Sequence, residues 1–240
     1  MGKNVLIIGA SGDIGTAVAG QLAGNGWQLI LHYNQNKRAM EFNRRRLNNE
    51  AILMEIQADL SEQSGINYLL SQFAFPVDAI VFAGGRAQYG LFQETDEQVM
   101  DAMLTLHVKA PWAITKHILP SMIHKQHGRI IFITSVWGEA GAGNEVVYSS
   151  VKGAQNSFVK ALAKETAPSG IAVNAVSPGF IDTKMNQHLL ADEKERIVDD
   201  IPANRAGTSE DVANTVSFLM NEQSDYIHGE IIHVSGGWQS

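Results

Sequence analysis

Short β-branched or Leu-rich runs alternate along the chain with longer, helix-prone stretches. Such runs predict strands, because β-branched side chains pack well on a pleated surface. The predicted strands cover residues 5–8, 28–33, 52–57, 79–82, 129–134, 171–176 and 231–234. The stretches between them predict helices near residues 14–24, 36–48, 61–73, 95–125, 148–167 and 209–220.

Uninterrupted apolar strands separated by helices predict a parallel sheet that is covered on both faces. Right-handed crossovers between the strands then give a doubly wound fold. A chain of 240 residues without an obvious linker fits one domain. We therefore expect a single doubly wound α/β domain over residues 1–240, with seven parallel strands. The charged, helix-prone segment 183–205 interrupts the alternation and is interpreted as a mobile lid or substrate loop.

Composition excludes several classes of partner and chemistry. Cysteine is absent, which excludes disulfides and thiol catalysis, and the net charge of −7 argues against a nucleic-acid partner. No apolar run approaches the ~20 residues that span a membrane, and the start "MGKN" does not resemble a secretory signal. No metal site is expected, since the histidines at 117, 124 and 127 lack nearby carboxylates. We expect a cytoplasmic protein.

The stretch "VLIIGASGDIGTAVA" places Gly9, Gly12 and Gly15 between a predicted strand and a predicted helix. Backbone N–H groups at a helix start attract phosphate, and glycine lets the backbone approach it closely. The loop predicts a dinucleotide cradle, with a plain tight turn as the alternative. A carboxylate at Asp13, ~5 Å from a phosphate, would cost roughly 3 kcal/mol at an effective dielectric near 20. We therefore predict that Asp13 caps the helix and points away from the pyrophosphate.

The end of the second predicted strand distinguishes the two nicotinamide cofactors. An acid there would bind a ribose 2′-hydroxyl and repel a 2′-phosphate. The sequence "LHYNQNKR" has no acid and continues into Lys37 and Arg38, so NADP(H) is favoured over NAD(H). The alternative is that both cations are ordinary surface charges. Asp59 ends the third strand, where a carboxylate either binds an adenine amine or caps the segment that begins at Ser61.

The stretch "ITSVWGEAGAGNEVVYSSVKGA" carries the candidate chemistry. Tyr148 and Lys152 are four residues apart and so share one helix face. A lysine ammonium beside a phenol is expected to lower the tyrosine pKa from about 10 toward neutrality. Such a tyrosine can give a proton to a carbonyl oxygen as hydride arrives at carbon, which typically contributes ~10²–10⁴-fold. Ser135, at the end of a strand, can hold the same oxygen.

Six pieces of the chain together resemble the short-chain dehydrogenase/reductase family over essentially the full length: "GASGDIG", "ADL", "GRIIFITS", "YSSVK", "VNAVSPGFIDT" and "GEIIHVSGGW". The resemblance is greatest to 3-oxoacyl-[acyl-carrier-protein] reductases. It implies a single Rossmann-type domain, a homotetramer or homodimer, and hydride transfer with NAD(P). It also implies that Tyr148 is the acid/base, that Lys152 binds the nicotinamide ribose, and that Ser135 positions the substrate.

The resemblance further implies a set of cofactor contacts, with Ile181 and Thr183 near the nicotinamide carboxamide. The expected contacts are Gly9, Ser11, Gly12, Asp13, Ile14, Gly15, Asn34, Lys37, Asp59, Leu60, Ala83, Gly84, Gly85, Tyr148, Lys152, Pro178, Gly179, Ile181 and Thr183.

The chain departs from the family pattern at two functional places. Asp13 stands where the family has the middle glycine of its loop, and His107 stands where the family has a catalytic asparagine. That asparagine helps to hold a water in a proton relay to the lysine. His107 is expected either to hold the water or to titrate, with an ordinary pKa near 6.5. The alternative is a hydrogen-bonded helix histidine.

Two docking arginines, typical of reductases that act on carrier-bound acyl chains, are replaced here by Gln126 and Ser169. Lys125 and Arg129 are close in sequence, so we expect docking of an acidic carrier to be weakened rather than excluded.

The pocket is expected to have an acidic lip. Glu139 and Glu145 would lie over it, with Trp137 and Phe180 as apolar walls, unless both glutamates point to solvent. An acidic lip suits a cationic or neutral small ketone better than a carrier-bound chain. The pieces "LHYN", "HVKA" and "SSVKGAQNSFVKALAKE" are similar to a bacterial subfamily that reduces a 5-aminopentanone group on a lysine of elongation factor P. A third hypothesis, a cofactor-binding regulator without catalysis, conflicts with the intact Ser–Tyr–Lys spacing.

Overall fold

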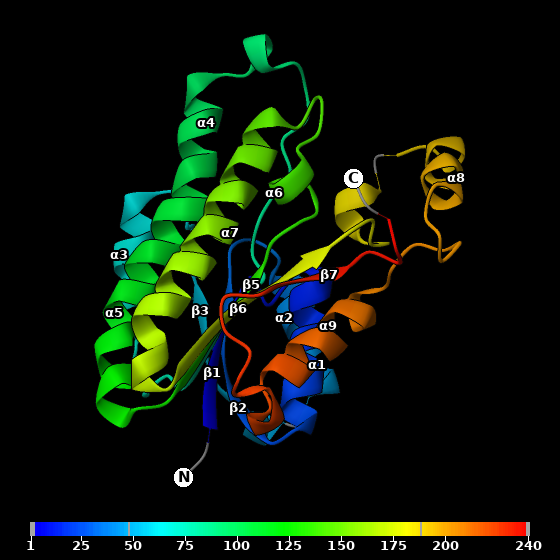
Figure 1. Ribbon diagram of the computed structural model, residues 1–240. Coiled ribbons are helices and arrows are strands. Elements are labelled where there is room, and N and C mark those ends of the chain that lie inside the picture. The colour runs from blue at the N-terminus through cyan, green and yellow to red at the C-terminus, as the bar shows by residue number, and fades with distance from the viewer. Residues whose placement is uncertain (1–2, 48, 188, 239–240) are drawn as a thin grey trace.

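A seven-stranded parallel sheet forms the centre of the molecule. The computed structural model describes residues 3–47, 49–187 and 189–238. Its strand order, β3-β2-β1-β4-β5-β6-β7, reverses direction between β1 and β4, which confirms the doubly wound fold (Figure 1). The strands are β1 (Lys3–Ile8), β2 (Trp27–Tyr33), β3 (Ile52–Gln57), β4 (Ala79–Phe82), β5 (Gly128–Ile133), β6 (Ile171–Pro178) and β7 (Ile231–Val234).

Helices cover both faces of this sheet, as the strand pattern predicts (Figure 1). Because successive side chains of a strand point to opposite faces, Leu6 and Ile8 pack in one core while Val5 and Ile7 pack in the other. The first core lies under α3 (Gln63–Ser71), α5 (Ala110–Lys125) and α7 (Val146–Thr166). The second lies under α1 (Asp13–Gly24), α2 (Lys37–Arg46) and α9 (Ser209–Leu219).

The helix expected near residues 95–125 is divided by a π-helical turn. It consists of α4 (Glu97–Leu104), the turn η3 (Thr105–Lys109) and α5. The Ala110 N–H donates to the Thr105 carbonyl, five residues back. Pro111 has no N–H for the His107 carbonyl four residues before it, and the side chain of Gln155 donates to that carbonyl instead, at 2.8 Å. The turn places His107 on the side of α7.

Segment 183–205 contains η5 (Lys184–Asn186) and α8 (Ala191–Asp199), and α8 lies outside the two helical layers (Figure 1). None of the described helices is long and apolar enough to cross a membrane. The remaining short elements are η1 (Asn49–Ala51), η2 (Phe92–Glu94), α6 (Trp137–Ala140), η4 (Ala167–Ser169) and η6 (Glu222–Ser224).

The expectation that Arg129 helps to dock an acidic carrier is wrong. Arg129 is only 2% exposed, donates to the Leu219 carbonyl at 3.1 Å and forms an ion pair with Asp225. Lys125 is paired with Asp78 at 2.6 Å. The Arg129 pair satisfies a buried charge at the start of β5, and the exposed Lys125 pair joins the end of α5 to the residue before β4.

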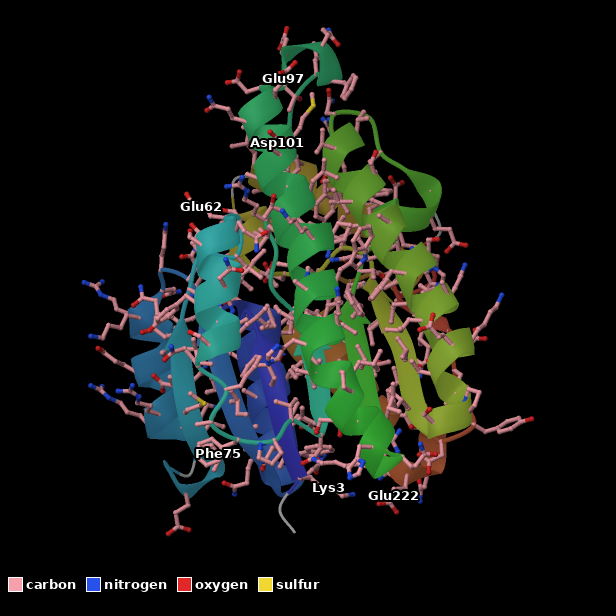
Figure 2. The ribbon with its side chains drawn as sticks, turned by 90° about the vertical axis from the view of Figure 1, so that its left-hand side faces the viewer. Lys3, Glu62, Phe75, Glu97, Asp101 and Glu222 are labelled. Atoms are coloured by element: carbon pink, nitrogen blue, oxygen red, sulfur yellow. The ribbon has the colours of Figure 1, made fainter. Side chains whose placement is uncertain are left out.

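The positions of the missing docking arginines lie at the amino edge of the sheet. Gln126 ends α5 just before β5, and Ser169 lies just before β6. Figure 2 shows this end of the molecule, marked by Lys3 and Glu222, opposite the tip of α4. Within one chain these positions are therefore remote from the carboxyl ends of the strands, where ligands bind in such folds.

Candidate active site

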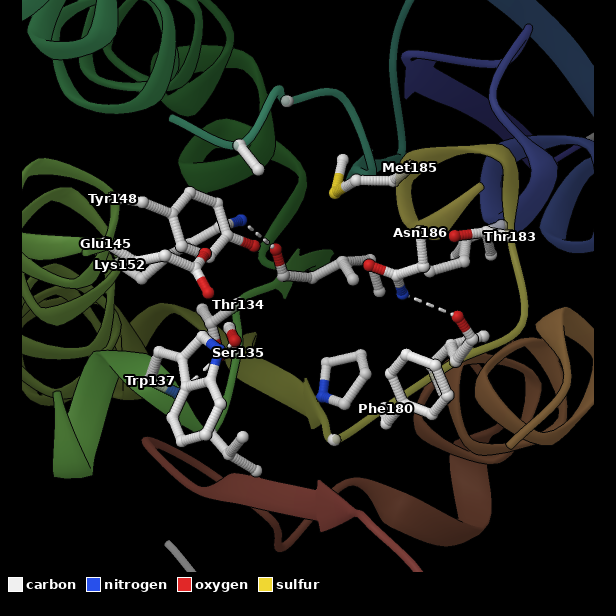
Figure 3. A pocket seen from close by; sticks show the side chains of 18 of the residues that line it. Thr134, Ser135, Trp137, Glu145, Tyr148, Lys152, Phe180, Thr183, Met185 and Asn186 are labelled. Atoms are coloured by element: carbon white, nitrogen blue, oxygen red, sulfur yellow. Dashed lines mark hydrogen bonds between the residues drawn. The ribbon is translucent and has the colours of Figure 1, made fainter. Parts of the chain in front are cut away.

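A cavity of about 230 Å³ opens beyond the carboxyl ends of β4, β5 and β6. Its walls come from the turns that follow these strands, from α7 and from segment 183–205 (Figure 3). All four residues predicted to be catalytic line it: His107, Ser135, Tyr148 and Lys152. The spacing along the sequence thus becomes a cluster in space, because a strand end and one face of α7 meet there.

Ser135 and Tyr148 line the same cavity, and the Ser135 side chain favours a lower pKa of the Tyr148 phenol. Ser135 lies two residues after the end of β5, and its Oγ accepts the Trp137 N–H at 3.3 Å, so the turn into α6 orients the hydroxyl. Gly138 lets α6 pack closely on α7, since a Cβ there would lie 2.8 Å from the Lys152 carbonyl carbon. A larger residue would separate the serine from the tyrosine.

Lys152 is buried beneath Tyr148 and is only 4% exposed. Its Nζ donates to the Ile133 carbonyl at 2.8 Å and lies 5.6 Å from the centre of the Tyr148 ring. Burial lowers the pKa of Lys152 to about 7, because the ammonium has lost its hydration. At neutral pH this side chain therefore carries only part of a positive charge.

The predicted neutral pKa of Tyr148 is wrong for the cofactor-free chain. Burial raises the pKa of the phenol above its ordinary value, the Ser135 hydrogen bond opposes the rise, and the charges of Glu145 and Tyr89 add to it. A partly charged Lys152 cannot offset the loss of hydration that a phenolate would suffer there. Tyr148 is consequently a neutral phenol, ready to act as a proton donor.

His107 faces this pair from the π-helical turn. Its ring meets the Tyr148 ring edge-on, with 6.0 Å between centroids, and its Nε2 contacts the Arg86 carbonyl at 3.1 Å. Burial, then the charge on Lys152, lowers the pKa of His107 to about 3. The expectation that it titrates near neutrality is therefore wrong. Its Nδ1 is buried and has no hydrogen-bond partner among the described residues, as a site for a water requires.

Gln155 is a site residue that the sequence reasoning missed. It lies three residues after Lys152 in α7 and is 4% exposed. Its amide holds the His107 carbonyl, while its Oε1 has no partner within the described chain. The sequence signal that could have identified Gln155 is a polar residue on the core-facing side of the predicted helix 148–167. Together, Gln155 and His107 leave two unsatisfied polar atoms around the π-helical turn behind the lysine.

The glycine loop has the shape of a cradle for a dinucleotide. Gly9 has a φ of +82°, and a Cβ on it would lie 2.3 Å from the Gly84 Cα. A Cβ on Gly15 would lie 2.2 Å from the Gly9 carbonyl oxygen. Only glycine permits this approach, so these residues fit the group that the sequence implies. Ten of the expected contacts line the cavity itself: Ile14, Ala83, Gly84, Gly85, Tyr148, Lys152, Pro178, Gly179, Ile181 and Thr183.

His32 contacts the glycine loop from the end of β2, and the sequence analysis did not identify it. Its Nδ1 accepts the Gly9 N–H at 3.3 Å, and its Nε2 contacts the Ala58 carbonyl at 3.0 Å. Burial lowers the pKa of His32 to about 4, so the ring is neutral near pH 7. The imidazole therefore ties the first glycine to the end of β3.

Of the two roles expected for Asp59, adenine binding and capping, the structure shows the capping of the segment that begins at Ser61. The Asp59 carboxylate accepts the Ser61 N–H at 2.9 Å and the Ser61 hydroxyl at 2.6 Å. These bonds, with one from Asn34, hold the pKa of Asp59 below its ordinary value. Leu60 is buried, which leaves only its backbone for a ligand. Contact of this region with adenine stays a prediction.

A second groove runs outward from the glycine loop between α1, α2 and α9. Ser11, Asp13, Asn36 and Arg38 line it. Lys37, which the sequence favoured, is exposed at the first turn of α2 and does not line that groove. Of the two cations Lys37 and Arg38, Arg38 is therefore the one that lines the groove leading outward from the glycine loop.

The predicted helix cap at Asp13 is wrong. Gly12 is the N-cap of α1, and Asp13 is the first residue of the helix. The Asp13 carboxylate instead accepts the backbone N–H of Lys184 at 2.7 Å and lies 3.5 Å from the Lys184 ammonium. Asp13 bonds to a residue distant in sequence, because the turn at Lys184 directs a backbone N–H toward the Asp13 carboxylate.

Three of the four expected substrate contacts line the cavity: Trp137, Glu145 and Phe180. Figure 3 shows Glu145 beside Tyr148, across the cavity from Asn186. Glu139 lies elsewhere, because α6 directs it toward β7, where it pairs with His233 at 2.9 Å.

The sequence did not identify several further lining residues: Ala87, Tyr89, Met185, Asn186, Leu189, Ile197 and Trp238. No three described His, Asp or Glu side chains are grouped to hold a metal ion.

Comparisons with known proteins point to one family. A family model described as Enoyl-(Acyl carrier protein) reductase matches residues 9–239. The chain is 46% identical to the Uncharacterized oxidoreductase YmfI of Bacillus subtilis, covering 99% of each. It is 32% identical to the 3-oxoacyl-[acyl-carrier-protein] reductase FabG of Escherichia coli, over 98% of this chain and 97% of that one. Its fold matches a gluconate 5-dehydrogenase from Burkholderia cenocepacia, solved with NADP and tartrate, with a TM-score of 0.90, 24% identity and coverage of 99% and 95%.

The burial of Lys152 predicts a pH dependence of stability. Between pH 7 and 10.5 the unfolded chain binds a proton at this lysine that the folded chain has lost, so stability rises with pH in that window. From pH 7 to 9 the wild type should gain about 2 kcal/mol of unfolding free energy more than Lys152→Met does. Urea unfolding at the two pH values measures this, with Lys160→Met, an exposed position on the same helix, as the control. Equal gains in the wild type and Lys152→Met would contradict the burial argument.

Proposed function

Because the chain belongs to the short-chain dehydrogenase/reductase family and is an oxidoreductase, we propose that it reduces a ketone with NADPH, with Tyr148 as proton donor. One observation carries the proposal. The Tyr148 phenol lines one cavity with Ser135 and buried Lys152, and the turns that follow β4 and β6 line the same cavity. A ketone in this cavity meets an acid and a hydroxyl donor on one side.

The side chains divide the chemistry between them. When bound, NADPH supplies the hydride. Ser135 and Tyr148 hold the carbonyl oxygen by hydrogen bonds, which strengthen as negative charge develops on it. The carbonyl carbon gains a C–H bond, and the oxygen takes the phenol proton of Tyr148. Lys152 then stabilises the phenolate that remains and returns a proton to it, since an amine with a pKa near 7 releases and regains protons readily.

The preference for NADPH is supported by the outer groove. Residue 34, which follows β2, is Asn, so no acid opposes a 2′-phosphate at this point. Arg38 lines the groove together with Ser11, which puts a cation and a hydroxyl where a phosphate could be bound. Contact of Asn34 with the adenosine ribose belongs to the same proposal.

The remaining parts of the proposal concern the lid and the assembly. Met185, Asn186 and Leu189 come from segment 183–205 and line the cavity, which supports a role for that segment in covering the substrate. Leu104 and Trp112 are 51% and 48% exposed. Apolar side chains of that size on a helical surface support association of copies into a homodimer or homotetramer. We place this enzyme in the cytoplasm.

A second candidate substrate class is favoured by the position of Glu145. A carboxylate beside Tyr148 suits a ketone that carries an amine, such as a 5-aminopentanone group on a lysine of elongation factor P. The absence of the two docking arginines weakens the case for an acidic acyl carrier. A thioester of the 3-oxoacyl type is the first candidate substrate class, and its reduction uses the same chemistry.

We predict that the protein oxidises NADPH in the presence of a ketone and that Tyr148→Phe lowers kcat at least a hundredfold, because the proton donor is lost. A ketone screen with NADPH and NADH in parallel measures both the substrate class and the cofactor preference. Unchanged NADPH fluorescence binding in Tyr148→Phe is the control for folding. No turnover with any ketone, despite NADPH binding, would contradict the proposal and favour a regulator.

His107→Asn tests the proton relay. If a water at His107 Nδ1 passes protons to Lys152, the substitution should change kcat severalfold and shift the pH profile of kcat. The pH dependence of kcat, measured for both proteins with the same ketone, checks this. An identical rate and profile would remove His107 from the relay.

Glu145→Gln tests the charge preference of the cavity. For a ketone that carries an ammonium group, KM should rise about tenfold, while for a neutral ketone of equal length it should change little. Glu139→Gln, outside the cavity, is the matched control. Turnover of the acetoacetyl thioester alone, with none on ketone-bearing elongation factor P, would exclude the second candidate.

A further inference from the structure

Two distant parts of the chain meet at Asp13. The carboxylate at the first residue of α1 accepts the Lys184 N–H at 2.7 Å, across 171 residues of sequence. The Lys184 ammonium lies 3.5 Å from the same carboxylate. A carboxylate that accepts from a backbone N–H makes a charge-assisted bond, which is stronger than an exposed ion pair alone.

This bond joins two walls of the cleft between the glycine loop and the turn after β6. Ile14, next to Asp13, lines the cavity on one side, and Ile181 and Thr183, next to Lys184, line it on the other. The second wall is itself braced, because the Asn186 side chain donates to the Ile181 carbonyl at 2.8 Å. The contact at Asp13 therefore connects two stiff pieces.

We propose that Asp13 is a clasp, a positioning residue that holds the turn at Lys184 closed against the glycine loop. The proposal rests on the proposed function, in which that loop takes a dinucleotide. With the clasp closed, the turn and the loop enclose the bound dinucleotide, and it leaves when the Asp13–Lys184 bond opens. Asp13 thus slows cofactor release.

The clasp also explains why the Asp13 carboxylate can stand in a loop that is proposed to bind a pyrophosphate. The Asp13 side chain is 28% exposed, and its charge is directed at one N–H and one ammonium. Lys184 offsets the charge that would otherwise repel the pyrophosphate. If Asp13 served only as a repulsive charge, its removal would tighten cofactor binding, whereas loss of a clasp loosens it. The two roles therefore predict opposite signs.

Trypsin tests the clasp in the cofactor-free protein, because it cleaves after Lys184, the residue that the bond holds. Asp13→Ala should speed this cleavage severalfold, and Asp13→Asn, which keeps an acceptor for the N–H, should speed it less. Glu222→Gln, which removes the negative charge of the exposed Lys3–Glu222 pair near the opposite end of the sheet, should leave the rate unchanged. Equal cleavage in the wild type and both Asp13 variants would overturn the proposal.

Stopped-flow fluorescence then measures the dissociation of NADPH from the folded proteins. Asp13→Ala should release NADPH about tenfold faster than the wild type, while Lys184→Met, which keeps the backbone N–H, should change release less. Unchanged release, or a lower Kd in Asp13→Ala, would overturn the clasp although the proposed function stands. A wild type that binds neither NADPH nor NADH would instead refute the proposed function, and the clasp on a dinucleotide with it.

Discussion

The removal of the Lys152 ammonium from water is the constraint on which the site depends. Burial lowers the pKa of this lysine to about 7, and its ammonium donates a hydrogen bond to the Ile133 carbonyl at 2.8 Å. The lysine can occupy this place because its helix is anchored over β5 and β6 by a large apolar core. In the proposed reduction, a desolvated amine that exchanges protons near neutrality can return a proton to the Tyr148 phenolate.

The surroundings of Lys152 follow from this constraint. Gly138 brings α6 onto its backbone, and the π-helical turn brings His107 to its side. Pro111 leaves the His107 carbonyl without its helical donor, and Gln155 supplies one from α7. The turn and α7 are therefore joined by a hydrogen bond directly behind the lysine. The same two side chains keep His107 Nδ1 and Gln155 Oε1 without partners among the described residues, which makes this the polar part of the buried wall.

The sequence predicts most of the fold, because strand runs and strand spacing are local. The bounds of β3, β4 and β7 agree with the predicted ranges, and the Ser135–Tyr148–Lys152 cluster follows from one strand end and one helix turn. Features that depend on distant partners were not predictable. Asp13 bonds to Lys184, and Glu139 turns to His233, because tertiary neighbours decide where a short surface side chain points. The pKa of Tyr148 rises because burial, which a sequence motif does not reveal, outweighs the lowering influence of Ser135.

Titration of the Lys152 ammonium tests the account most directly. Protein labelled with ¹⁵N at the lysine side chains gives an NMR signal for each Nζ, and Lys152→Met assigns the one in question. We expect a midpoint near pH 7 in the cofactor-free protein, well below the ordinary value of 10.5. A midpoint at or above 10 would show that the amine is hydrated, and the proton-exchange role given to Lys152 would then be wrong.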